Sequence, residues 1–241
     1  MFALKRYTED LINLLFPDLC NGCGKLLYHG EKDICTKCLY DLPYTDFHLY
    51  HDNPVAKQLW GRLSVNAAMA MLYFKKATKV QNLIHGLKYD GKTEIGITLG
   101  KLLAKKLNES EFYADIDLII PVPLHQKKMR TRGYNQSEYI ATGLAEELGI
   151  SVGTKHLLRE KSTESQTKKA RYTRFENMQN VFTVESVKSL GSVKNMNDLA
   201  DKHILLVDDV VTTGATLEAC GNALLGHGIG KLSIATIAFA E

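Results

Sequence analysis

The stretch that decides the fold is Leu205-Leu206-Val207-Asp208-Asp209-Val210-Val211-Thr212-Thr213-Gly214-Ala215-Thr216, where an apolar run meets two carboxylates and a hydroxyl-rich turn. The run Ile204–Val207 is continuous and β-branched at both ends, which is typical of a buried strand in a parallel sheet. A helical pattern follows the turn. Strand, turn and helix together predict an α/β fold, in which ligands bind beyond the carboxyl ends of the strands.

The acid pair and the turn each suit one part of a sugar phosphate. Asp208 and Asp209 can accept hydrogen bonds from a sugar diol. The turn Thr212–Thr216 would present backbone N–H groups and hydroxyls at a helix N-terminus, which suits a phosphate. The combination predicts a site for a ribose 5-phosphate. The alternative is an ordinary strand, turn and helix with solvated acids, although a simple glycine turn does not need an acid pair.

Composition limits the class of protein. The 241 residues are 45% hydrophobic and 24% charged, which predicts one globular α/β domain plus a small module. Apolar runs fall short of the ~18 residues that span a bilayer, so we expect no membrane insertion. Glu9 and Asp10 argue against a secretory signal, and Thr8 instead caps a short amphipathic helix that stops near Pro17. We therefore expect a cytoplasmic protein, whose net charge of +3 leaves nucleic-acid binding to local patches.

Two cysteine pairs predict a metal site. Eleven residues separate the pair Cys20 and Cys23 from the pair Cys35 and Cys38, a spacing typical of four thiolates around a structural Zn²⁺. Gly22 and Gly24 would allow the tight turns, and a disulfide pair is disfavoured in a reducing compartment. His29 is a weak alternative ligand, and an exposed loop histidine is the simpler interpretation. Cys220 is interpreted as a small core residue of the last helix.

The pattern along the chain predicts two units, an N-terminal helix and zinc ribbon over residues 1–55 and an α/β domain over residues 56–241. The polar stretch Tyr44–Pro54, with His48 and His51, is interpreted as a solvated linker. Strands are expected at Val65–Phe74, Asp117–Ile120, Val181–Val184 and Leu232–Phe239, and helices at Thr78–Tyr89, Ile95–Asn108 and Asn135–Leu148. The segment Ser186–Asp201 is expected to be a loop or a hairpin extension.

Basic residues gather in two places. Four follow the stiff turn Pro121-Val122-Pro123, at the end of a predicted strand: Lys127, Lys128, Arg130 and Arg132. A second run, Lys155–Arg174, includes Arg159, Arg171 and Arg174. The first run is placed to meet a departing pyrophosphate or another anion, and the second suits a lid or a track for nucleic-acid phosphates. Solvated basic loops are the alternative for both.

The motifs together resemble one family over nearly the whole chain. After the cysteine pairs come LKYDG at Leu87–Gly91, PVPLH at Pro121–His125 and RGYNQ at Arg132–Gln136, then R-x6-Q at Arg159–Gln166, RFEN at Arg174–Asn177 and VDDVVTTGAT at Val207–Thr216. The last motif resembles the phosphoribosyl-diphosphate (PRPP) signature of type I phosphoribosyltransferases. The set as a whole resembles the ComF family of competence-associated phosphoribosyltransferase-like proteins.

The resemblance implies a type I phosphoribosyltransferase fold, Rossmann-like with a mostly parallel sheet flanked by helices, behind a zinc ribbon. It implies that Asp208 and Asp209 hold the ribose hydroxyls and serve as catalytic residues. The rest of the PRPP site would be Thr212, Thr213, Gly214 and Thr216 at the 5-phosphate, with Val210 and Ala215 beside them, and Pro121, Val122 and Pro123 at the pyrophosphate. The implied cofactors are structural zinc and Mg²⁺ bound with PRPP.

The resemblance leaves the kind of function open. As an enzyme, the chain would transfer a phosphoribosyl group to an unknown acceptor with Mg²⁺-assisted loss of pyrophosphate. As a binding module, it would sense PRPP or a 5-phosphate while its basic segments hold single-stranded DNA. A third possibility is a structural adaptor for a competence helicase with a vestigial pocket. The family implies a role in DNA uptake for natural transformation, with single-stranded DNA and the helicase as partners.

Overall fold

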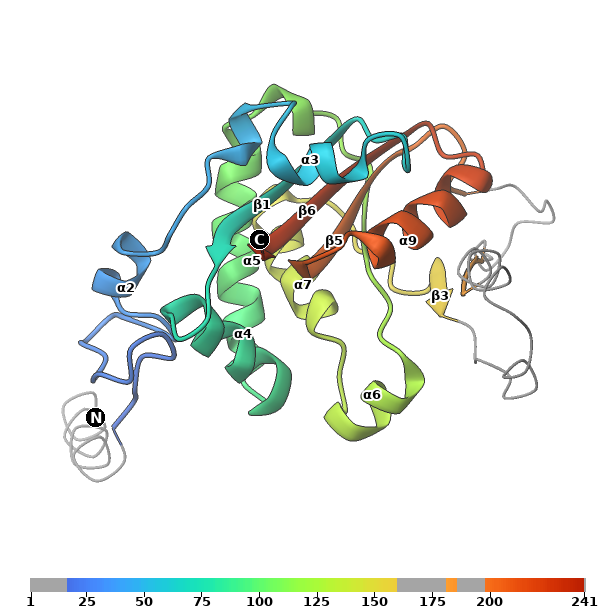
Figure 1. Ribbon diagram of the computed structural model, residues 1–241. Coiled ribbons are helices and arrows are strands. Elements are labelled where there is room, and N and C mark those ends of the chain that lie inside the picture. Colours follow the sequence, from blue (N-terminus) through green and yellow to red (C-terminus); the bar gives the residue numbers. More distant parts are fainter. Residues whose placement is uncertain (1–16, 160–180, 186–197, 241) are drawn as a thin grey trace.

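A four-stranded parallel sheet forms the centre of the computed structural model, which describes residues 17–159, 181–185 and 198–240 (Figure 1). The strands lie in the order β1 (Ala67–Phe74), β6 (Lys231–Ala240), β5 (His203–Val211) and β2 (Leu118–Pro121). Each neighbouring pair is parallel. The prediction of a buried parallel strand at Ile204–Val207 is confirmed, because all four residues are buried inside β5. The strands predicted near β1, β2 and β6 are confirmed too.

Helices cover both faces of the sheet. In Figure 1, α3 (Pro54–Leu59) and α9 (Ala215–Gly226) lie in front of the sheet, and α5 (Glu94–Asn108) and α7 (Gln136–Leu148) lie behind it. The helix α4 (Lys79–Tyr89) lies beside α5. Glycines let α5 and α7 approach closely, since a Cβ added to Gly100 would stand 2.2 Å from the Ile140 carbonyl oxygen. The three helices predicted from residue 78 to residue 148 are therefore confirmed.

The ends of α7 follow the capping rules. The Asn135 side chain accepts a hydrogen bond from the Ser137 N–H at 3.2 Å, which satisfies one of the free donors in the first turn. Gly149 ends the helix with φ of 72°, in the left-handed region that glycine favours. Because these signals are local, the sequence predicts the start and the end of α7 to within one residue.

Residues 17–45 form the cysteine-rich ribbon, which includes the short helix α2 (Thr36–Tyr40). The ribbon lies against α4 and α5 through side-chain hydrogen bonds. Asn82 donates to the Gly22 carbonyl at 2.9 Å, and Thr98 donates to the Asp33 carboxylate at 2.8 Å. The helix predicted after Thr8 lies outside the described residues, and the division of the chain near residue 55 stays a prediction.

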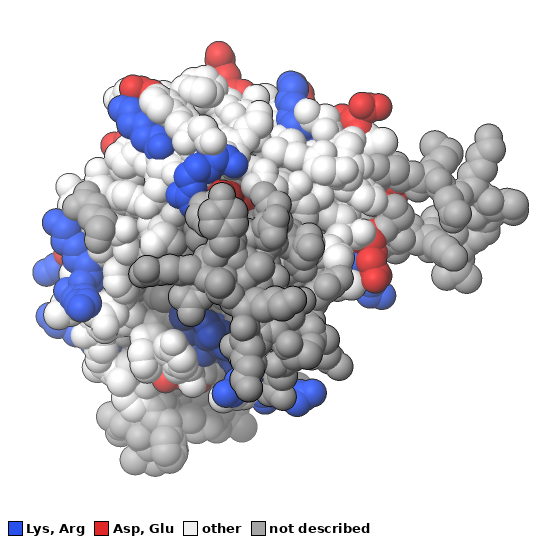
Figure 2. All heavy atoms as spheres, turned by 45° about the vertical axis from the view of Figure 1, so that its right-hand side comes forward, with Lys and Arg blue, Asp and Glu red and all other residues white. Residues whose placement is uncertain are grey.

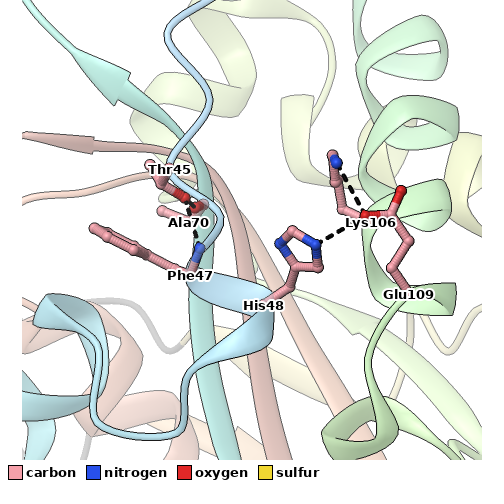
Figure 3. Close-up of polar contacts among 6 residues, drawn as sticks. All are labelled: Thr45, Phe47, His48, Ala70, Lys106 and Glu109. Atoms are coloured by element: carbon pink, nitrogen blue, oxygen red, sulfur yellow. Dashed lines mark hydrogen bonds and ion pairs between the residues drawn. The ribbon is translucent and has the colours of Figure 1, made fainter.

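The prediction of a solvated linker over Tyr44–Pro54 is wrong. The segment contains the 3-10 helix η1 (Phe47–Leu49), which packs against the sheet, and His48 is only 1% exposed. Its Nε2 lies 3.0 Å from a carboxylate oxygen of Glu109 at the end of α5 (Figure 3). Asn53 is buried and donates hydrogen bonds to three backbone carbonyls, whereas His51 is exposed as expected. The partner of His48 is distant in sequence, so the local pattern cannot reveal the packing.

Smaller elements lie outside the central sheet, among them a second sheet, a 3-10 helix and the helix α6 (Gln126–Arg132). A two-stranded antiparallel sheet joins β3 (Leu157–Arg159) to β4 (Phe182–Val184), and η2 (Glu111–Tyr113) is a second 3-10 helix. The strand predicted at Val181–Val184 is confirmed. Of the segment Ser186–Asp201, only residues 198–201 are described. None of the helices in the described ranges is both long and apolar enough to cross a bilayer.

Candidate functional site

The two carboxylates of the deciding stretch lie near the carboxyl end of β5. The strand continues to Val211, so the acids are part of it rather than the first residues after it. The Asp208 carboxylate accepts hydrogen bonds from Ser137 Oγ at 2.9 Å and from the Asp209 N–H at 2.8 Å. Asp209 is 3% exposed, and its Oδ1 lies 2.9 Å from Lys88 Nζ. In the described part of the chain, Asp209 Oδ2 is buried without a hydrogen-bond partner.

The environment of Asp208 changes its acidity. Burial and the neighbouring Asp209 charge raise the pKa of the Asp208 carboxyl to about 7, against the opposing effects of the Asp209 N–H, Ser137 and Lys88. Near neutral pH this side chain is therefore divided between its acid and carboxylate forms. It can either donate a hydrogen bond to a bound ligand or accept one from it.

The predicted pyrophosphate turn, Pro121 to Pro123, lies beside the acid pair. Pro121 is level with Val207 in the sheet, and the Val122 N–H donates to the Val207 carbonyl at 2.8 Å. Asn135 donates to the Val122 carbonyl at 3.0 Å and also caps α7, which carries Ser137. The RGYNQ motif thus joins the turn to the acid pair, a connection that the sequence order alone does not reveal.

The predicted phosphate turn follows β5 and begins α9. Gly214 is the residue before the helix and has φ of +73°, and a Cβ at this position would lie 3.1 Å from Leu59. Thr212, Thr213 and Thr216 are exposed, while Val210 and Ala215 are partly buried beside them. The turn therefore leaves three hydroxyls at the N-terminus of a 12-residue helix, as an anion site requires.

Two further side chains form hydrogen bonds to the backbone of this turn. The sequence does not single out either of them. Gln58, in α3, donates a hydrogen bond to the Thr212 carbonyl at 2.5 Å. Arg62 donates to the Thr213 carbonyl at 3.2 Å and pairs with Glu218 of α9. Both contacts use carbonyl groups, so neither occupies an N–H group or a hydroxyl of the turn, although the Thr213 hydroxyl accepts the Ala215 N–H at 3.5 Å. No local signal marks either residue, since their partners lie more than 150 positions further along the chain.

Basic side chains line a cavity of about 150 Å³ around the acid pair. They come from three elements: Lys88 from α4, Lys128 and Arg132 from α6 (Gln126–Arg132), and Arg159 from β3. The first basic segment, Lys127 to Arg132, is a helix and not a loop. The His125 side chain caps this helix by accepting a hydrogen bond from the Lys127 N–H. Helical geometry turns Lys128 and Arg132 to one side, four positions apart.

The remaining predicted basic residues are elsewhere. Arg130 lines an adjoining cavity of about 430 Å³, which lies between α6, α7 and β3 and shares Pro123, Leu124 and Arg159 with the first. Lys127 is exposed and lines neither of these two cavities. Arg171 and Arg174 lie outside the described residues. Within the described residues, Lys88, which the sequence places only within the LKYDG motif, is the basic residue that forms an ion pair with the acid pair.

The charged surface is divided rather than continuous. On the face drawn in Figure 2, Lys and Arg side chains form several separate groups, with Asp and Glu side chains between them. Among the residues coloured there, the basic groups do not merge into one track. The cavity at the acid pair brings four basic side chains together.

The four cysteines of the ribbon form a compact cluster. Their Sγ atoms all lie within 4.8 Å of one another, and none is in a disulfide. Zinc–sulfur bonds of about 2.3 Å place tetrahedral sulfurs about 3.8 Å apart, and the Cys23 and Cys35 sulfurs are 3.9 Å apart. Burial raises the pKa of the Cys20 thiol, but backbone N–H groups from Cys35, Cys23 and Gly22 outweigh it and lower the value to about 7.

These observations fit a structural metal. Cys20, Cys35 and Cys38 are buried, and a Cβ on Gly22 would stand 3.3 Å from Cys38 Sγ, so glycine lets the backbone approach the sulfurs. His29 is exposed, which confirms its interpretation as a loop residue. Cys220 is fully buried in α9, so its interpretation as a core residue is also confirmed.

Comparisons with known proteins agree with this architecture. A family model for the phosphoribosyl transferase domain matches residues 135–241. DNA utilization protein YhgH of Escherichia coli strain K12 is 27% identical over 224 residues, 90% of this chain and 88% of that protein. Competence protein F of Haemophilus influenzae is 26% identical over 221 residues, again 90% and 88%. The glutamine PRPP amidotransferase of B. subtilis superposes with a TM-score of 0.43 and 16% identity, covering 64% of this chain and 30% of that one.

The parallel sheet, its flanking helices and the domain match define a type I phosphoribosyltransferase-like protein with a four-cysteine cluster near the N-terminus. The relatives extend the match to nine-tenths of the chain. The similarity to these relatives over nine-tenths of the chain, together with the domain match, supports an assignment to the ComF family.

Proposed function

We propose that the chain binds PRPP at the end of β5. The observation that carries this proposal is the convergence of three features, namely the acid pair, the Pro121–Pro123 turn and the Thr212–Thr216 turn, at one end of the sheet. In the proposed complex, Asp208 and Asp209 accept hydrogen bonds from the ribose hydroxyls, and the N-terminus of α9 holds the 5-phosphate. The Pro121–Pro123 turn and the α6 cations Lys128 and Arg132 meet the pyrophosphate.

The chemistry that this arrangement supports is phosphoribosyl transfer. The bond between C1 of the ribose and the pyrophosphate oxygen breaks, pyrophosphate leaves with the electron pair, and a nucleophile of the acceptor forms a new bond to C1. Mg²⁺, bound mainly by the diphosphate itself, would neutralise the charge of the leaving group. The protein contributes by positioning and electrostatics, since cations outnumber acids among the described residues that line the cavity.

The relatives support a role in the handling of DNA. They carry the names DNA utilization protein and competence protein, and we extend that role to this chain as part of the proposal. Single-stranded DNA and a competence helicase are the proposed partners, with the cytoplasm as the expected compartment. Residues 1–55, the N-terminal helix and the zinc ribbon, are proposed as one unit, and residues 56–241 as the phosphoribosyltransferase-like domain.

Calorimetric titration with PRPP and Mg²⁺ tests the pocket. We expect wild type to bind one PRPP with a dissociation constant on the order of micromolar, about −8 kcal/mol. The double variant Asp208→Asn, Asp209→Asn keeps the shape of both side chains but removes their charge, and it should lose this binding. Asp46→Asn and Asp52→Asn, at exposed positions before α3, provide matched controls that should bind normally. Equal binding by wild type and the double variant would contradict the proposal.

Salt dependence separates DNA binding from pocket binding. If the basic segments follow a DNA backbone, the affinity for single-stranded DNA should fall with a log–log slope of about −0.7 per contacted phosphate. The affinity for PRPP should depend less on salt, because a single small ligand makes few such contacts. DNA binding that survives high salt unchanged would rule out a phosphate track.

A further inference from the structure

Lys88 forms an ion pair inside the proposed site, and the predicted PRPP motifs assign it no role. Its Nζ lies 2.9 Å from Asp209 Oδ1, and the two side chains are 22% and 5% exposed. In the described structure, Asp209 Oδ2 is buried and has no hydrogen-bond partner. One oxygen of this carboxylate is thus held by a fixed charge, and the other stays available to accept a hydrogen bond.

The helix α4 holds Lys88 in place. Val80, Leu83, Ile84 and Leu87 of this helix are buried in the core. The carbonyl of Leu87, directly before Lys88, accepts a hydrogen bond from the Tyr134 hydroxyl in the loop before α7. The backbone of Lys88 is therefore fixed to the same core that positions Asp209.

Building on the proposed function, we infer that Lys88 is a positioning residue that orients Asp209 toward the ribose hydroxyls and favours the carboxylate form of the neighbouring Asp208. Two adjacent carboxylates in a buried site repel each other, and a cation at ion-pair distance offsets that repulsion. The lysine thus increases the share of Asp208 that accepts a hydrogen bond from the sugar near neutral pH. Without the lysine, a larger share of Asp208 would be protonated and would donate instead.

Other charged and titratable groups also face the pair. Within the described residues they are Tyr89 from α4, Lys128 and Arg132 from α6, Arg159 from β3 and the Cys220 thiol from α9. Within the described residues, Lys88 alone forms an ion pair with either carboxylate. Burial and Asp209 raise the pKa of Asp208, and Lys88 acts in the opposite direction.

The test compares wild type with Lys88→Met, Lys88→Arg and Lys128→Met. Methionine keeps the length of the side chain without its charge, arginine restores the charge, and Lys128→Met removes a different charge from the same cavity. The first readout needs no ligand: ¹³C NMR of labelled aspartate carboxyls follows the titration of Asp208, with the signal assigned through Asp208→Asn. The second is PRPP affinity by calorimetry between pH 6 and pH 9.

We expect Lys88→Met to raise the pKa of Asp208 above its value of about 7. PRPP affinity should fall about tenfold at pH 7, the usual effect of losing a charged hydrogen bond, and the deficit should shrink toward pH 9. Lys88→Arg should restore most of the affinity. Lys128→Met should weaken binding with the pH profile of wild type.

Two results separate this inference from the function on which it rests. If wild type binds PRPP but Lys88→Met leaves the Asp208 titration and the pH profile unchanged, the role of Lys88 is overturned and the proposed function stands. If wild type binds no PRPP, the proposed function fails and the assignment of Lys88 to a ribose site fails with it.

Discussion

At the scale of single residues, the acid pair is arranged for binding rather than for stability. Asp208 lies in a site that raises its pKa to about 7 through burial and the adjacent Asp209. A carboxyl whose pKa is raised in the folded state binds protons there that the unfolded chain has already released. The Asp208 carboxyl therefore lowers the free energy of unfolding as the pH rises from about 4 to about 7. Such a cost is common at functional sites.

Asp208→Asn should relieve this cost. The asparagine oxygen can still accept from Ser137 and from the residue 209 N–H, while the charge is gone. We expect the free energy of unfolding at pH 8 to rise by on the order of 2 to 4 kcal/mol, with little change at pH 4, where the native carboxyl is already protonated. Urea denaturation of wild type and variant at pH 4 and pH 8 measures this difference in the free energy of unfolding. A variant that is less stable than wild type at pH 8 would contradict this account of the pair.

The sequence predicts the acids and the phosphate turn because each is marked locally. Asp208, Asp209 and Gly214 lie within one short motif whose parts match a ligand group by group. Lys88, Gln58 and Arg62 reach the same site from elements far earlier in the chain. Their side chains are ordinary for helix surfaces, so only the three-dimensional packing reveals what they contact.

At the scale of elements, the segment Tyr44–Pro54 shows how a polar pattern can hide packed structure. Phe47 and His48 are buried, and Lys106 and His48 together hold the pKa of Glu109 below its usual range (Figure 3). Thr45 adds a hydrogen bond to the Ala70 carbonyl of β1. The segment, which follows the ribbon in sequence, therefore packs against β1 at the edge of the sheet.

His48→Ala should destabilise the protein. Removing a buried side chain leaves a cavity and leaves Glu109 with Lys106 as its remaining ion-pair partner among the described residues, which costs roughly 1 to 3 kcal/mol. His29→Ala is the matched control, because His29 is exposed and should change the free energy of unfolding by less than about 0.5 kcal/mol. Chemical denaturation of both variants gives the comparison. Equal stability of the two would mean that the segment is solvated in solution.

Regular elements with strong local signals are predicted well, and short or packed ones are not. The sequence gives β5, α5 and α7 because their apolar periods and caps are continuous. It misses α6, because a run of basic residues has no apolar period and its cap is the side chain of His125. The helix matters for function, since it carries Lys128 and Arg132 into the acid-pair cavity.

At the scale of the whole molecule, α4 connects the ribbon with the acid pair. One end of this helix contacts the ribbon through Asn82, and its last turn carries Lys88 to the acid pair. Lys88 lies six positions beyond Asn82 along α4, and its ammonium contacts Asp209. We therefore expect a damaged ribbon to leave the pocket largely intact.

Cys20→Ser tests this separation. We expect zinc content, measured by atomic absorption, to fall well below one ion per chain, because the cluster loses one of its four thiolates. The ribbon should lose stability, and PRPP affinity should change by less than about threefold. One zinc per chain still bound in the variant would contradict the four-thiolate site. A large loss of PRPP binding in folded protein would show that the ribbon shapes the pocket.

The central claim is that one ligand joins the acid pair to the two turns. The measurement that tests it most directly is a crystal structure of the protein with PRPP and Mg²⁺ bound. The account predicts ribose hydroxyls within hydrogen-bond distance of Asp208 and Asp209, with the 5-phosphate at the N-terminus of α9. A ligand bound instead in the adjoining cavity beside Arg130 and Met129, or a phosphate turn left empty, would contradict it.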